Sequence, residues 1–138
     1  MEAPYGERRD RSITFNHTIL AARDRHVSAT FFTHLFGLPE PTAWGPFVSV
    51  RLDEDLFLQF AEPGINDIQM QHDAFLVDDR SFDEISARLL QGGIEHWADP
   101  QATLPGRIHT HHGGRGVYFR DPVGHGFAIL TRPSGSAT

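Results

Sequence analysis

The chain has 138 residues, which is enough for a single domain with its own hydrophobic core. Hydrophobic residues make up 39% of it and charged residues 22%, a balance typical of folded globular proteins rather than disordered ones. The formal net charge of −6 argues against a general nucleic-acid binder, and the absence of cysteine excludes disulfides, thiolate nucleophiles and zinc–thiolate sites.

No apolar run approaches the roughly 20 residues that a membrane span needs, and the polar start of the chain lacks the apolar core of a signal peptide. We therefore expect a cytoplasmic protein that has neither a membrane nor nucleic acid as its partner. The nine histidines are the unusual feature of the composition, and metal is the obvious thing for some of them to hold.

The first half of the chain predicts a tail, a strand and a helix. Residues 1–11 are polar, and we expect a flexible N-terminal tail there. Apolar residues alternate over 13–20 as in a strand, and His17 lies on their face. Asp24 suits the N-cap of a helix, and Gly37 suits its C-terminal end.

Strand-like runs at 47–52 and 56–61 then complete the first half. The second half begins again with a strand at His72. Ser81 and Glu84 predict a capping box at the start of a second helix, because Ser at the N-cap and Glu three residues later satisfy each other's backbone N–H groups.

Three further strands are predicted near the end, at 94–98, 116–120 and 126–131. The Gly-, Pro- and His-rich stretch 99–116 is predicted to be a long loop or an irregular strand. Asp at the first position, Pro at the second and Gly at the fourth of 121–124 favour a type I turn between the last two strands.

A repeat connects the two halves. His17 and His72 stand 55 residues apart (from 17 to 72), and the same spacing of 55 separates Gly37 from Gly92. Such a repeat predicts a duplicated supersecondary unit. Two copies related by a pseudo-twofold axis could bring the paired histidines to one central place, so these histidines are the leading candidates for a functional site.

Together, these elements predict an α+β fold of two repeated βαβββ modules. We expect them to form a cup-shaped, mostly antiparallel sheet with helices outside. The predicted single domain spans 12–133 and consists of module 12–62 and module 70–133, with a C-terminal tail at 134–138.

Four stretches carry a resemblance to a known family. They are FNHTIL around His17, FFTHLFGLPEP at the end of the first helix, QHDAFLVDD around His72, and the closing run RGVYFRDPVGHGFAIL. With these motifs the chain resembles the vicinal oxygen chelate superfamily, which includes glyoxalases, bleomycin-resistance proteins, fosfomycin-resistance enzymes and extradiol dioxygenases. The resemblance covers nearly all of the chain from Ile13 to Pro133. It implies the paired-module fold and a homodimer, with sites that in some members form from strands of both chains.

The resemblance also implies a metal site. Members usually hold one divalent metal ion, with ligands on the first and last strands of each module, and those positions here are His17, Gln59, His72 and Ala128. An amide oxygen can coordinate a metal, but the methyl group of Ala128, which replaces the usual glutamate, cannot. The remaining donors are neutral, and iron, manganese, nickel, zinc or copper would each fit them. Alternatively, the two histidines line the cup, where they bind an organic ligand or hydrogen-bond in the core.

Four side chains are candidates for substrate contact. The resemblance places Tyr118 near the site, as a candidate catalytic and substrate-binding residue. Phe57 could supply a stacking surface. Arg115 could bind an anionic group, although arginines near turns are usually solvated. His112 belongs to a histidine-rich loop that is either simply solvated or a lid over the cup.

Two neighbours of His112 share these alternatives. His109 and His111, in the same loop, either face solvent or help to supply a general base or a replacement ligand. His125 lies in the predicted turn between the last two strands, and is more typical of a turn or rim residue than of a ligand.

Two functions follow from these features. The first is a metal-dependent enzyme of the lyase, isomerase or dioxygenase class, which acts on a small oxygen-rich molecule chelated to a divalent metal held by His17 and His72. The alternative is a metal-free protein of the bleomycin-resistance type, which binds or sequesters an antibiotic-like small molecule. A third possibility is an inactive scaffold or a regulatory dimer.

Overall fold

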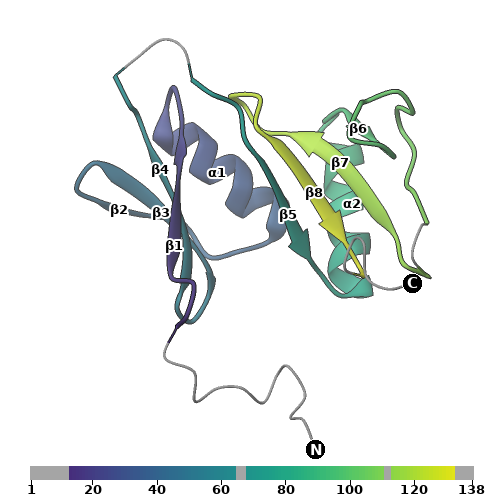
Figure 1. Cartoon of the computed structure of the whole chain (residues 1–138), viewed down its shortest axis with the longest axis horizontal. Helices are drawn as coiled ribbons and strands as arrows, with labels where there is room; N and C mark the ends of the chain where they lie inside the picture. The colour runs from purple at the N-terminus through teal and green to yellow at the C-terminus, as the bar shows by residue number, and fades with distance from the viewer. Residues whose placement is uncertain (1–12, 65–67, 111–112, 133–138) are drawn as a thin grey trace, which may run out of the picture.

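The chain folds into two modules, each with its own four-stranded sheet (Figure 1). The computed structural model describes residues 13–64, 68–110 and 113–132. In chain order the elements are β1 (His17–Ala21), α1 (Arg25–Phe36), β2 (Thr42–Trp44), β3 (Phe47–Asp53), β4 (Leu56–Ala61), β5 (His72–Leu76), α2 (Asp79–Gln91), β6 (His96–Trp97), β7 (Gly116–Arg120) and β8 (Gly126–Leu130).

Strands β1, β4, β3 and β2 form sheet A in that order, and β5, β8, β7 and β6 form sheet B. In both sheets the first strand of the module pairs in parallel with the last one, and the other pairs are antiparallel. The predicted α+β fold of two βαβββ modules is therefore confirmed.

Helix α1 forms where it was predicted because both of its ends are capped. The Asp24 carboxylate accepts hydrogen bonds from the backbone N–H groups of His26 at 3.0 Å and Val27 at 3.1 Å. Gly37 ends the helix with a φ of 67°, a left-handed conformation that glycine adopts without steric cost.

Helix α2 begins earlier than predicted, and the expected capping box at Ser81 and Glu84 is wrong. The N-cap is Asp78, whose carboxylate accepts a hydrogen bond from the backbone N–H of Ser81 at 2.7 Å. Glu84 instead forms an ion pair with Arg80 at 3.3 Å. Asp78 and Ser81 are both good capping residues, and the helix starts at the first of them after β5 ends.

Two strands also differ from expectation. β1 begins only at His17, opposite Phe57, because its partner β4 itself begins at Leu56 and leaves residues 13–16 without a ladder to join. The edge strand β2 was not predicted, since only three residues separate Pro41 from the turn at Gly45. Both differences come from pairing between strands, which alternation within one strand does not reveal.

One face of each sheet is buried against helices. In sheet A, Leu20 and Phe60 belong to the fully buried core that includes residues of α1. The ring of Phe32 in α1 also lies edge-on to Phe75 and Phe127 of sheet B, with ring centroids 5.3 and 5.6 Å apart. Helix α1 therefore packs against both sheets. Neither helix of the described residues is long and apolar enough to cross a membrane.

The other face of each sheet is open. Ile19 on sheet A is 48% exposed, and Leu76 on sheet B is 63% exposed. Because side chains alternate along a strand, both of these faces point away from the buried faces on which α1 packs. Among the residues that the structure describes, the two open faces of a single chain therefore do not enclose a common cavity.

Candidate functional site

Three of the predicted site residues lie together on the open face of sheet A. His17 pairs with Phe57 across β1 and β4, and Ile19 pairs with Gln59. Residues directly opposite one another in a sheet project to the same side, and so do residues two apart in one strand. His17, Phe57 and Gln59 thus share one face, as the resemblance implied for the first and last strands of a module.

Asn16 orients the His17 ring through a hydrogen bond to Nδ1. The amide nitrogen of Asn16 donates a hydrogen bond to the backbone carbonyl of Asp55 at 2.9 Å, which turns its amide oxygen toward His17. That oxygen lies 2.7 Å from Nδ1 of His17 and accepts its hydrogen. In this tautomer Nε2 of His17 carries the lone pair that a metal ion or a substrate proton requires.

Gln59 has an equivalent arrangement. Its amide nitrogen donates a hydrogen bond to the hydroxyl of Ser49 at 3.4 Å, so the carbonyl oxygen is the atom left to face a ligand. On the same face, Trp44 and Phe47 stack with ring centroids 6.2 Å apart. The open face of sheet A therefore combines an imidazole, an amide and aromatic rings.

The second group of predicted residues lies on the open face of sheet B. Tyr118 pairs with Ala128 across β7 and β8, and Ala128 pairs with Ala74, which is two residues from His72. The rings of His72 and Tyr118 have centroids 6.0 Å apart. His72 lies over Gly126, because a Cβ built on that glycine would sit 3.2 Å from Nδ1 of His72. Ala128 is only 1% exposed, so its methyl group lies beneath the larger side chains of this face.

His109 joins this face from the loop before β7. Its ring centroid lies 5.9 Å from that of Tyr118. It was predicted either to face solvent or to belong to a lid, and the structure places it beside Tyr118. His111 and His112 lie outside the described residues.

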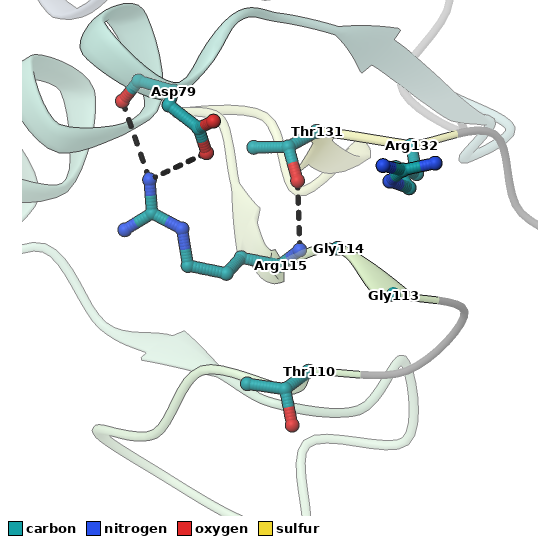
Figure 2. A pocket seen from close by; sticks show the side chains of 7 residues that line it. All are labelled: Asp79, Thr110, Gly113, Gly114, Arg115, Thr131 and Arg132. Carbon is teal, nitrogen blue, oxygen red and sulfur yellow. Dashed lines mark hydrogen bonds and ion pairs between the residues drawn. The ribbon is translucent and has the colours of Figure 1, made fainter.

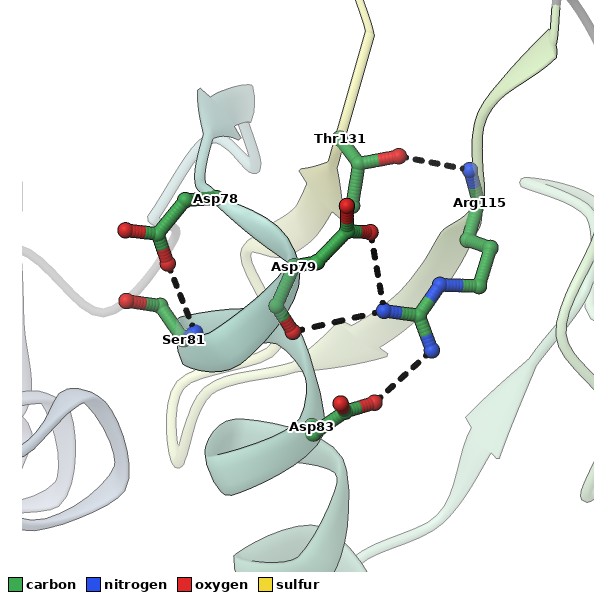
Figure 3. Close-up of polar contacts among 6 residues, drawn as sticks. All are labelled: Asp78, Asp79, Ser81, Asp83, Arg115 and Thr131. Carbon is green, nitrogen blue, oxygen red and sulfur yellow. Dashed lines mark hydrogen bonds and ion pairs between the residues drawn. The ribbon is translucent and has the colours of Figure 1, made fainter.

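Arg115 lies on the other side of sheet B from His72. Its guanidinium forms ion pairs with Asp83 at 2.8 Å and Asp79 at 3.0 Å, both on α2 (Figure 3). It also covers the ring of Phe82. Hydrogen bonds to the carboxylates of Asp83 and Asp79 raise the pKa of Arg115 above its ordinary value, so this side chain stays charged. Its partners are carboxylates of the protein, and the structure does not bring it together with Tyr118.

A pocket of about 680 Å³ opens beside Arg115 (Figure 2). Asp79, Thr110 and Thr131 help to line it, and the hydroxyl of Thr131 accepts a hydrogen bond from the backbone N–H of Arg115 at 2.8 Å. The Arg115 guanidinium is already compensated by two acidic residues. The compensated charge of Arg115 therefore makes this pocket a weaker binding site for an anion than an unpaired arginine would.

The arginine on the His72 face is Arg120. It follows Tyr118 by two residues in β7, and its guanidinium lies 5.2 Å from the ring centre of Trp97. The alternation of β7 was enough to find it. Counting by twos from Tyr118 selects Gly116 and Arg120 and excludes Arg115.

His125 lies in the connection between β7 and β8, as predicted, but it is an interior residue and not a rim residue. Its side chain is fully buried, Nε2 donates to the carbonyl of Ala21 at 2.8 Å, and Nδ1 accepts from the N–H of Gln71 at 3.1 Å. The turn sequence itself forms as predicted, with the Gly124 N–H bonded to the Asp121 carbonyl at 3.0 Å. The turn folds back onto β1, and this buries the ring.

Within one chain these residues do not form a metal centre. Across the described residues, no three His, Cys, Asp or Glu side chains gather closely enough to hold an ion. His17 with Gln59, and His72 with Tyr118, stand on two separate open faces. Any site that uses both histidines therefore needs the two faces to meet in an assembly.

Comparison with known proteins places the chain in a family. No protein-family model matches it. It is 31% identical over 119 residues to the glutathione transferase FosA of Serratia marcescens, which covers 81% of this chain and 76% of that protein. The solved structure of the oxidase ChaP-H1 is 48% identical, covers 91% of this chain and 100% of that one, and has a TM-score of 0.85. The solved structure of the oxidase ChaP-H2 is 41% identical, covers 93% of this chain and 100% of that one, and has a TM-score of 0.86.

A more distant structure has the same fold. It is the glyoxylase/bleomycin resistance protein/dioxygenase domain from Frankia sp. EAN1pec, at 16% identity and a TM-score of 0.65, with 89% of this chain and 100% of that one covered. This likeness shows the fold alone. The identity to FosA, however, extends over more than two thirds of each protein. The chain belongs to the vicinal oxygen chelate superfamily.

Proposed function

We propose that the protein is an enzyme that oxidises a small organic molecule with neighbouring oxygen atoms, in a site that two chains build together. The observation that carries the proposal is the 48% identity to the oxidase ChaP-H1 over the whole of that chain. In the reaction the substrate loses electrons, and dioxygen is the oxidant that gains them.

The open faces support a site between two chains. A twofold dimer that sets sheet A of one chain against sheet B of the other would cover both faces at once, including Ile19 and Leu76, which are otherwise exposed. It would also place His17 and Gln59 opposite His72 of the partner chain. Two equivalent sites per dimer would result.

The donors in such a site fit a divalent metal ion in type. Asn16 leaves the lone pair of His17 Nε2 available, and Gln59 keeps its carbonyl oxygen available. His17, Gln59 and His72 would hold the ion, which would supply a Lewis acid for two neighbouring substrate oxygens. All three donors are neutral, so we expect weaker metal binding than in relatives with a carboxylate at the position of Ala128.

The remaining residues bind and orient the substrate. Phe57, with the stacked Trp44 and Phe47, offers an aromatic wall on sheet A. On sheet B the hydroxyl of Tyr118 is the candidate to donate a hydrogen bond to a substrate oxygen. Arg120 places a positive charge on the same face, which favours a substrate that carries a negatively charged oxygen.

A second candidate function is capture of a small molecule without chemistry, as in bleomycin-resistance proteins. The specific observation in its favour is Ala128, because this buried methyl group stands where a metal-binding relative has glutamate. Aromatic surface and neutral polar groups suffice for tight binding of an apolar ligand.

Oxygen uptake separates the two functions. The assay uses alizarin, a flat dihydroxyanthraquinone, and related hydroxylated aromatics, with iron, manganese, nickel, zinc or copper added singly. We expect oxygen uptake that is lost in His17→Ala and in His72→Ala, and unchanged in the control His34→Ala, an exposed residue of α1. Tight binding with full recovery of unaltered compound, and no oxygen uptake, would replace oxidation with capture.

The metal set has its own test. Ala128→Glu restores a carboxylate on the face of His72, and calorimetric titration with zinc should show affinity at least tenfold higher than in the wild type. The control Ala74→Glu puts the same charge on the neighbouring position of β5. Equal gains in the two variants, or no gain in either, would contradict the assignment of Ala128 to the metal position.

A further inference from the structure

His109 is fixed to the edge of sheet B through its backbone. Its N–H donates to the carbonyl of Gly116 at 2.9 Å, and the N–H of Gly116 donates back to the carbonyl of His109 at 3.0 Å. This reciprocal pair extends the sheet beyond β7. His109 therefore has a defined position although it lies outside the named strands.

The loop that leads to His109 is tied down as well. The Asp99 carboxylate accepts hydrogen bonds from the hydroxyl of Thr103 at 2.6 Å and from the N–H of Leu104 at 2.9 Å. Further along, the Gly106 N–H donates to the carbonyl of His96 at 2.8 Å. In its described part, this loop is a scaffold attached to β6 and β7.

Gly116 allows the His109 ring to lie flat on the sheet. A Cβ built on Gly116 would overlap Nε2 of His109, so the imidazole occupies most of the space that a side chain at 116 would need. Cδ2 of Leu130 would lie 2.8 Å from that Cβ, but it is the end of a flexible side chain and can shift. A Cβ on Gly126 would likewise meet the ring of His72. Two imidazoles of one sheet face thus each cover a glycine of the adjacent strand.

These imidazoles flank a single tyrosine. The centroids of His72 and His109 lie 6.0 and 5.9 Å from that of Tyr118, and their planes are tilted from its plane by 30° and 38°. Beneath the rings, β8 contributes Gly126 and Ala128 to this face, and Leu130 lies further along it, opposite Gly116. Three rings in a row, with small residues beneath His72 and Tyr118, offer a broad aromatic surface.

We propose that His109 is a third ring of the substrate site, and that this site takes a flat aromatic molecule which lies across His72, Tyr118 and His109. Flat ligands gain most from contact with several rings at once, and the tilt of the rings suits contacts to a ligand's faces and edges. The inference rests on the proposed function, because the ligand is the molecule that the enzyme oxidises. It adds a residue that the metal-ligand positions do not include.

The test is a titration of alizarin, followed by absorbance, with four variants. His109→Ala removes the ring. Gly116→Ala keeps His109 in the sequence but displaces its ring. The double variant, His109→Ala with Gly116→Ala, removes the overlap between the two side chains. His96→Ala, on the opposite face of the same sheet, is the matched control. Thermal unfolding of each variant identifies any loss of folded protein.

We expect His109→Ala and Gly116→Ala each to weaken alizarin binding by about tenfold. The double variant should bind as weakly as His109→Ala and no more weakly, because both changes remove the same contact. It should also regain the thermal stability that Gly116→Ala loses. His96→Ala should bind within twofold of the wild type.

Two outcomes overturn the inference, and they are distinguishable. If His72→Ala and Tyr118→Ala lose binding while His109→Ala binds as the wild type does, His109 is outside a site that otherwise stands. If alizarin and its relatives do not bind the wild type, or bind it regardless of all three residues, the proposed substrate class fails together with the inference.

Discussion

His125 contacts both modules with one side chain. Its ring nitrogens hydrogen-bond to Ala21 at the end of β1 and to Gln71 just before β5, in an interior with no exposed surface. Asp121 holds the turn that carries the ring, and accepts a hydrogen bond from the N–H of His125 at 2.8 Å. Removing the ring takes away the protein partner of both of these backbone groups.

His125→Ala should therefore destabilise the fold strongly. We expect a loss of about 2–4 kcal/mol in the free energy of unfolding, from the cavity and from two unsatisfied backbone groups. Urea unfolding measures it. The control His96→Ala removes a half-buried ring that bonds only the nearby carbonyl of Ile94, and should cost less than half as much. Equal losses would contradict the role of His125 as a link between modules.

The sequence indicated which residues are candidates for the site better than it indicated the sheet face to which each side chain points. His17 and Gln59 were assigned to one site, and they share a sheet face. Arg115 was also assigned to the site because of its charge, but it turns to α2, because it is three residues from Tyr118 and side chains alternate between the two faces of the sheet. The burial of His125 depends on a contact with Ala21, 104 residues away, and no local pattern in the sequence could reveal it.

At the scale of elements, the start of α2 responds to pH. The pKa of Asp78 lies below its ordinary value of 3.8, mainly because its carboxylate accepts a hydrogen bond from the backbone N–H of Ser81. A carboxylate whose pKa is lowered in the folded state stabilises that state at pH values above its ordinary pKa. The contribution disappears as the pH falls through the lowered value.

Asp78→Ala should accordingly lower the melting temperature by a few degrees near neutral pH. The difference from the wild type should shrink as the pH falls below 3.8 and through the lowered pKa of the wild-type carboxylate. Thermal unfolding at several pH values measures the difference. Asp78→Asn keeps an N-cap that does not titrate, and should show a smaller difference. A difference that stays constant with pH would contradict the assignment.

Elements whose ends are marked by capping residues in the sequence were predictable, and elements that depend on pairing with another strand were not. α1 has Asp24 and Gly37 at its two ends, and the structure uses both. α2 offers two capping residues in succession, Asp78 and Ser81, and the sequence pattern selected the second where the structure uses the first. β2 has only three residues, and it exists because β3 offers an edge with which to pair.

For the whole molecule, the proposed site depends on how chains assemble, and one sequence does not show that. The duplicated modules predicted paired histidines, and both lie on open faces as expected of site residues. The sequence could not reveal that helix α1 packs against both sheets, with the two faces pointing away from it. A shared site therefore requires a partner.

Mixing two inactive variants tests this assembly. In a dimer of one His17→Ala chain with one His72→Ala chain, one site carries both substitutions and the other carries neither. Refolding the variants together at equal concentrations should restore about a quarter of the wild-type alizarin binding capacity, because half of the dimers are mixed. Each variant alone should show none. If the mixture also shows none while an affinity tag on one variant co-purifies the other and so confirms mixed dimers, the site lies within one chain.

The glycines beneath the two imidazoles tie the site to strand alignment. If β7 or β8 slipped by one residue against its neighbours, Val117 or Phe127 would move to the position that Gly116 or Gly126 now holds. Either bulky side chain would displace the ring above it. A misaligned chain could then remain compact and yet have no affinity for the ligand, so ligand present during refolding should enrich the correctly aligned form.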